Sequence, residues 1–135
     1  MCTIIPKTSV NRPKTAKKDI VVYKGCDRIW GDDKYDKVSA HYQSFTYIKD
    51  KLNTTKLHYS LSENCASDAI EGDYKDSLDN YVAITRGFHA FCKLDPIRLR
   101  WCGVTCEFVI PKGSKYHVNP VGNIVSNQII FKKIL

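Results

Sequence analysis

The stretch Gly103-Val-Thr-Cys-Glu-Phe-Val-Ile110, followed by Pro111-Lys-Gly113, decides the fold that the sequence predicts. Apolar residues alternate with polar or small ones along it, which is typical of a β-strand with one buried face. Proline suits the second position of a type I turn and glycine suits the fourth, so the strand is expected to end there. We therefore predict a central strand that leads into a tight turn.

The rest of the chain repeats short apolar runs that are separated by turn residues. Asn119-Pro-Val-Gly-Asn123 has the same turn chemistry, so the segments on either side of it are expected to be strands. A further turn is expected at 49–53. The predicted strands are residues 19–23, 38–48, 56–60, 81–85, 103–110, 115–118 and 124–131.

Two segments have the features of short helices. Ser62 is a candidate N-cap for a helix at 63–70, and Gly72 limits its length. Asp95 and Pro96 suit the first turn of a helix at 94–100. The predicted fold class is therefore α+β and mainly β, a small single-domain sheet with one or two short helices.

The N-terminal segment differs in composition from the rest. It contains Pro6, Pro13 and several lysines without an amphipathic period, and proline disfavours a helix there. We predict that residues 1–18 form a basic extended arm, which either floats or lies across the domain surface. Residues 19–135 are predicted to form a single strand-rich globular domain, because a chain of 135 residues fits one domain.

The formal net charge of +7 is unevenly distributed. Residues 86–135 hold eight basic and two acidic residues, and residues 1–19 hold five basic and one acidic, whereas the middle is acidic. Basic ends indicate an anionic partner, either a small molecule or an acidic host macromolecule. No apolar run approaches the ~20 residues of a membrane span, and the start lacks an apolar signal core, so we expect a cytoplasmic protein without a membrane partner.

The cysteine pattern favours free thiols. The six cysteines are Cys2, Cys26, Cys65, Cys92, Cys102 and Cys106. In a reducing compartment such residues are usually small buried hydrophobes. His89 forms a three-cysteine, one-histidine set with Cys92, Cys102 and Cys106, but no Cys-x-x-Cys is present and the spacing is unusual for zinc. We predict no metal and no cofactor.

Candidate binding residues gather in the second half of the chain. The turn Ile110-Pro-Lys-Gly-Ser-Lys-Tyr116 can present N–H donors and lysine charge to a phosphate, and His89 lies between aromatic residues near Arg86. Alternatively, His89 is a hydrogen-bonded structural residue and the lysines protect a sheet edge. The predicted ligand-binding residues are Arg86, Phe88, His89, Lys112, Lys115 and Tyr116, with an aromatic ring stacking on a base.

The segments Arg86-Gly-Phe-His-Ala-Phe91 and Ile110-Pro-Lys-Gly-Ser-Lys-Tyr116 resemble small uncharacterised proteins of Bacteroides-type bacteria and their phages. The resemblance implies a bacterial or phage protein in the cytoplasm, in the host cytoplasm if phage-encoded. It assigns no function, although phage accessory proteins of this size often sequester host proteins or nucleotide signals. The Val-Tyr-Lys strand and the later aromatic-histidine segment also resemble ADP-ribosyltransferases, in which Glu107 would have to serve as the late glutamate.

These observations support three functional hypotheses. The leading one is a non-enzymatic protein that sequesters a phosphate-bearing, nucleotide-like small molecule. The first alternative is a protein- or nucleic-acid-interaction module, such as a phage anti-defence protein, that uses the basic arm. The second is an ADP-ribosyltransferase-like enzyme, or another enzyme that uses His89 with Glu107 or Cys2.

Overall fold

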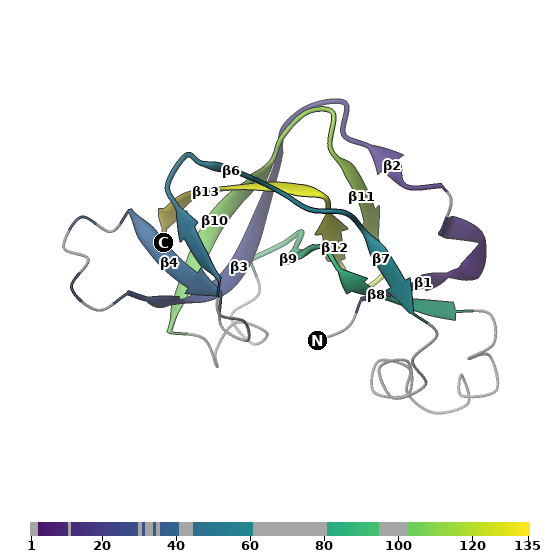
Figure 1. Cartoon of the computed structure of the whole chain (residues 1–135), viewed down its shortest axis with the longest axis horizontal. Helices are drawn as coiled ribbons and strands as arrows, with labels where there is room; N and C mark the ends of the chain where they lie inside the picture. The colour runs from purple at the N-terminus through teal and green to yellow at the C-terminus, as the bar shows by residue number, and fades with distance from the viewer. Residues whose placement is uncertain are drawn as a thin grey trace.

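A computed structural model of the chain describes residues 3–10, 12–29, 31, 34, 36–40, 45–60, 81–94 and 103–135. These residues are mainly β (Figure 1). The strands are β1 Thr3–Pro6, β2 Lys14–Thr15, β3 Ile20–Arg28, β4 Lys37–Ala40, β5 Thr46–Ile48, β6 Leu52–Thr54, β7 His58–Ser60, β8 Tyr81–Arg86, β9 Phe88–Phe91, β10 Val104–Ile110, β11 Lys115–Val118, β12 Asn123–Ser126 and β13 Gln128–Ile134. A 3-10 turn, η1, spans Lys7–Ser9.

The strands form two antiparallel sheets. The larger sheet has the order β2-β11-β12-β9-β3-β10-β13-β6, and the smaller has the order β1-β8-β7. In Figure 1 the smaller sheet lies at the lower right, below the β11 and β12 end of the larger one. The two sheets are connected directly at Gly87, which joins β8 of the smaller sheet to β9 of the larger.

The strands β3 and β10 form the centre of the larger sheet. Their register runs from Ile20 opposite Ile110 to Cys26 opposite Val104. Every second residue of β10 points into the core, and Phe108 is fully buried there opposite Val22. The predicted central strand at 103–110 is thus confirmed, while β3 extends beyond the predicted 19–23 because β10 pairs with most of its length.

The larger sheet curls until a ring of strands closes. β4 pairs with β3 and β5 pairs with β4. Directly after β5, Lys49 forms a parallel bridge with Phe131 of β13, and the Asp50 N–H donates to the Phe131 carbonyl at 2.9 Å. The ring β3-β4-β5-β13-β10 contributes most of the main core, to which β9 and β12 also contribute. In this core the Phe108 ring lies 4.9 Å from Tyr47 and 5.4 Å from Phe131.

A second, smaller core joins the two sheets. It contains Ile5 of β1, Val82 and Ile84 of β8, and Val125 of β12. Ile5 and Val125 are almost completely buried, so β1 is held by apolar packing as well as by its pairing with β8.

Much of the predicted N-terminal arm is therefore paired with the rest of the chain. β1 lies in the smaller sheet, β2 pairs with β11, and Ala16 is buried. Of the two arrangements considered for the arm, this segment lies across the molecule and does not float. It also contains η1, so the prolines do not exclude a helical turn here.

Two sequence expectations about strands were wrong, and one expected turn is shorter than predicted. The expected strand at 38–48 is a pair of antiparallel strands, β4 and β5. A turn is present within 49–53, where the Lys51 N–H donates to the Ile48 carbonyl at 3.1 Å, but it ends before β6 begins at Leu52. The expected strand at 124–131 is divided at Asn127, where the chain passes from the β11 side of the sheet to the β10 side. Apolar alternation continues through such a break, so periodicity alone does not reveal it.

The expected one or two short helices are not borne out. The described part of the chain contains no α-helix, and the segments predicted as helices, 63–70 and 94–100, lie outside the described residues except for Leu94. No described helix has the length and apolar character needed to cross a membrane.

Candidate functional site

Two of the aromatic residues predicted to contact a ligand belong to the core. Phe88 is 9% exposed, and its ring lies 6.2 Å from Phe45 and 6.3 Å from Tyr47. Tyr116 is partly buried against the same core. Both residues are opposite Ser126 on β12, so they share one sheet face. Phe88 therefore stabilises the core through ring packing and presents little surface to a base.

His89 lies on the other face of β9, as expected for the residue after Phe88 in an extended strand. Its Nδ1 is 3.2 Å from the Thr3 hydroxyl of β1, and Lys24 donates to its carbonyl at 2.8 Å. Burial and the nearby Lys24 charge lower the pKa of His89 to about 4. His89 is thus a neutral histidine that links the two sheets, which agrees with the structural alternative.

A second histidine, which no sequence pattern assigned to a ligand site, makes a parallel contact. His117 is on the same sheet face as His89, and Val125 lies between them. Its Nε2 is 2.7 Å from the Tyr59 hydroxyl of β7, and burial lowers its pKa. The two histidines therefore both connect the larger sheet to the smaller one.

Arg86 and Lys115 are brought near each other by a chain of hydrogen bonds. Arg86 Nε donates to the Thr55 hydroxyl at 3.1 Å, and the Thr55 N–H donates to the Asn127 carbonyl at 2.9 Å. The Lys115 N–H donates to Asn127 Oδ1 at 2.9 Å. Both cationic side chains are exposed, so this pair forms a surface and no enclosed site.

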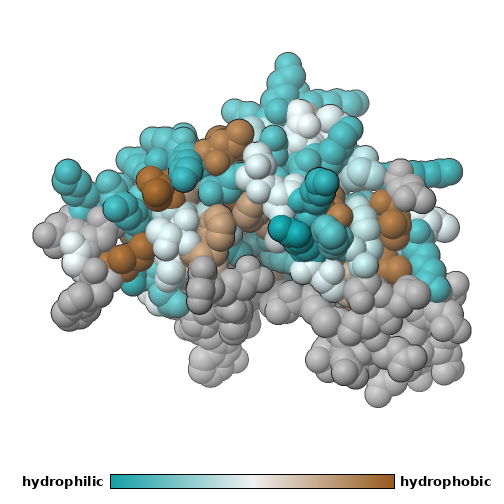
Figure 2. Space-filling model, in the orientation of Figure 1, coloured by the Kyte–Doolittle hydropathy of each residue, from teal (hydrophilic) through white to brown (hydrophobic). Residues whose placement is uncertain are grey.

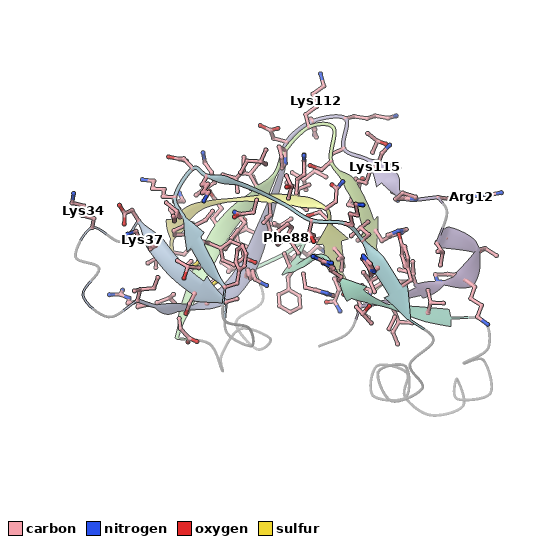
Figure 3. All side chains as sticks on the ribbon, viewed as in Figure 1. Arg12, Lys34, Lys37, Phe88, Lys112 and Lys115 are labelled. Carbon is pink, nitrogen blue, oxygen red and sulfur yellow. The ribbon has the colours of Figure 1, made fainter. Side chains whose placement is uncertain are left out.

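Lys112 lies at the tip of the turn between β10 and β11 (Figure 3). The turn hydrogen bond runs from the Ser114 N–H to the Pro111 carbonyl, with Gly113 at φ 90° in the third position. This is type II geometry, one residue later than the expected type I turn. The turn at Asn119 does have glycine fourth, with the Gly122 N–H donating to the Asn119 carbonyl.

Neither alternative chemical site is assembled in the described residues. Glu107 is half-buried on β10, opposite Tyr23 and Lys133. Cys106 lies in the main core, where it hydrogen-bonds the free thiol of Cys26, whereas His89 faces Thr3. Cys2, the other predicted partner of His89, and Cys102 are outside the described residues, and those residues contain no cluster of three potential metal ligands.

A basic pocket of about 370 Å³ lies at one end of the ring of strands. Arg28 comes from the end of β3, Lys49 directly follows β5, and Lys133 comes from β13. Lys34 extends from the segment between β3 and β4 (Figure 3), and the pocket also includes the last two residues of the chain. Ring closure at Lys49 therefore places cations from separated segments around one hollow.

The electrostatics of this basic pocket favour an anion. Its described lining residues are Arg28, Lys34, Lys49, Lys133, Ile134 and Leu135. Four of them have cationic side chains and none has an acidic side chain. The four cationic side chains are exposed and line the same pocket, so a bound anion would meet positive charge from several segments of the chain.

No residue of the basic pocket is among the ligand-binding residues predicted from the sequence. Arg28, Lys34 and Lys49 lie in the acidic middle of the chain, where the regional charge gives no signal. Lys133 is one of two adjacent lysines near the end. Their proximity depends on the Lys49–Phe131 bridge, which no sequence pattern indicates.

Comparison with protein-family models, with curated proteins and with solved structures found no match for this chain. The resemblance to Bacteroides-type and phage proteins therefore stays a prediction.

Proposed function

We propose that the protein binds a phosphate-bearing small anion in the basic pocket. The observation that carries the proposal is the meeting of four cationic side chains around a single hollow: one from β3, one from β13, one from the residue that follows β5, and one from the loop between β3 and β4. Charge-assisted hydrogen bonds from arginine and lysine are the usual means of holding phosphate groups. This keeps the leading hypothesis from the sequence but assigns the ligand to different residues.

The basic pocket matches a ligand with several phosphate oxygens. Three cations come from ends of strands, and Lys49 is anchored by the adjacent bridge to Phe131. Cationic groups that the fold already positions lose less freedom when the ligand binds than flexible ones would. Base recognition is not part of the proposal, because the described lining supplies no aromatic ring.

Isothermal titration calorimetry with inorganic phosphate, pyrophosphate, tripolyphosphate, ATP and adenosine tests this function. We expect heat from the polyphosphates and ATP, and none from adenosine. Lys49→Ala and Lys133→Ala should each weaken pyrophosphate binding at least about tenfold, since a hydrogen bond to a charged group contributes about 1.5–3 kcal/mol.

Lys112→Ala is the matched control, because it removes the same charge from an exposed turn away from the basic pocket. It should bind pyrophosphate like the wild type. The proposal is wrong if no anion of the panel gives heat, or if Lys112→Ala weakens binding as much as Lys49→Ala does.

A further inference from the structure

A second group of cations lies far from the basic pocket, along the β2 edge of the larger sheet. We call it the basic edge, and it consists of Arg12, Lys14, Lys17, Lys18, Lys112 and Lys115. All six side chains are exposed. Figure 3 shows Lys112 at the top of the molecule and Arg12 at its right margin, with Lys115 between them. In Figure 2 the same upper margin is covered mainly by hydrophilic side chains.

The basic edge is held in place by backbone pairing. Thr15 is opposite Lys115 in the β2–β11 ladder, and Lys115 Nζ donates to the Thr15 hydroxyl. Ala16 is buried, its N–H donates to the Ser114 carbonyl at 2.9 Å, and its carbonyl accepts from the Gly113 N–H at 2.8 Å. The arm lysines and the turn lysine therefore belong to one surface, although about a hundred residues separate them in sequence.

Acidic side chains do not neutralise this surface. Residues 12–19 and 111–116 hold the six cations and one acid, Asp19, so their net charge is +5. Asp19 Oδ1 accepts from the Lys112 backbone N–H at 2.9 Å, so it orders the turn. Among the residues that the structure describes, no carboxylate forms an ion pair with the six cations.

The residues of the basic edge and their spacing favour binding of a phosphate backbone over pairing with an added peptide strand. Pro13 has no N–H to donate, and Lys14 and its neighbours carry the features that protect sheet edges from strand addition. Alternate residues of an extended segment lie about 6.6 Å apart, so Arg12 and Lys14 present regularly spaced charges. A polymer with regularly repeated negative charge complements this arrangement.

We propose that the basic edge binds the phosphate backbone of double-stranded nucleic acid without reading its sequence. Such binding draws on counterion release, and its affinity falls as salt rises. This interaction goes beyond the proposed small-anion site and uses different residues.

Fluorescence anisotropy of a labelled DNA duplex with the full chain tests the proposal. The expected dissociation constant is about 1–100 µM, the range of nonspecific DNA binding at physiological salt. The double variant Lys14→Gln/Lys17→Gln should weaken binding about tenfold at low salt. It should also reduce the slope of log affinity against log salt concentration by about 2, since each neutralised phosphate contributes about 0.9.

Lys49→Gln/Lys133→Gln is the matched control, because it removes the same charge from the basic pocket. It should bind the duplex like the wild type, and circular dichroism should show that both variants are folded. Deleting the arm is unsuitable, since the deletion would also remove β1 from the smaller sheet. The inference is refuted if the wild type fails to bind the duplex, if both double variants lose equal affinity, or if polyglutamate binds and the duplex does not.

Discussion

Replacement of Gly87 by alanine tests how the two sheets are joined. Gly87 has φ 156°, and a Cβ there would lie 2.4 Å from Val125 Cγ1 and 2.8 Å from Leu57 Cδ2. Val125 is fully buried and cannot move aside. Backbone strain destabilises the folded state by about 1–3 kcal/mol, and overpacking destabilises it by about another 1–3 kcal/mol. Alanine also lowers the conformational entropy of the unfolded chain, which stabilises the folded state by about 0.4–1 kcal/mol. We expect Gly87→Ala to lower the free energy of unfolding by about 1–5.6 kcal/mol.

Gly113→Ala provides the matched control. Gly113 has φ 90°, but no atom lies within 4 Å of the added Cβ, so only backbone strain remains. Urea unfolding followed by far-ultraviolet circular dichroism gives the free energy of each variant. Gly87→Ala should lose about 1–3 kcal/mol more than Gly113→Ala, which is the overpacking cost. Equal losses, or a smaller loss for Gly87→Ala, would refute the close approach of the two sheets at this glycine.

Two further predictions concern buried titratable groups. The pKa of His89 is lowered to about 4 from the unfolded value of 6.5, so its contribution to stability is complete above pH 6.5 and is lost as the pH falls towards 4. Between pH 7 and pH 5 the wild type should lose about 1–2 kcal/mol more than His89→Gln in urea unfolding, and a difference that does not change with pH contradicts this. A hydrogen bond to the Cys106 thiol and burial raise the pKa of Cys26, so Cys26 and Cys106 should resist iodoacetamide in the folded protein and react in urea. Peptide mass spectrometry measures this, and equal alkylation rates in both conditions would exclude the buried thiol pair.

The elements that were predicted correctly from the sequence are those that depend on residues close together in the chain. The alternation from Val104 to Ile110 identified the central strand, and Asn119-Pro-Val-Gly-Asn123 identified a turn that the structure contains. The free thiols expected for Cys26, Cys92 and Cys106 are also confirmed. In each case the pattern and the structural cause lie within a few residues of each other.

Long-range pairing explains most of what the sequence did not predict. The break at Asn127 arises because β12 pairs with β11, whereas β13 pairs with β10. The ring of strands closes through one bridge between Lys49 and Phe131. Phe88 was predicted to contact a ligand because its aromatic ring could stack on a base. Its position opposite Ser126 instead places it in the core. Regional charge counts gave no signal for the basic pocket, because three of its four cations lie in the acidic middle of the chain.

The pairing of β3 with β10 has a consequence for synthesis of the chain. Ile20 is opposite Ile110, so the ribosome synthesises β3 about ninety residues before its partner strand β10. Until β10 has been synthesised, the edge of β3 that pairs with it has no hydrogen-bonding partner. The apolar residues of β3 can then form non-native contacts. The nascent protein therefore depends on late folding, and conditions that slow elongation between these two strands should increase its demand for chaperones.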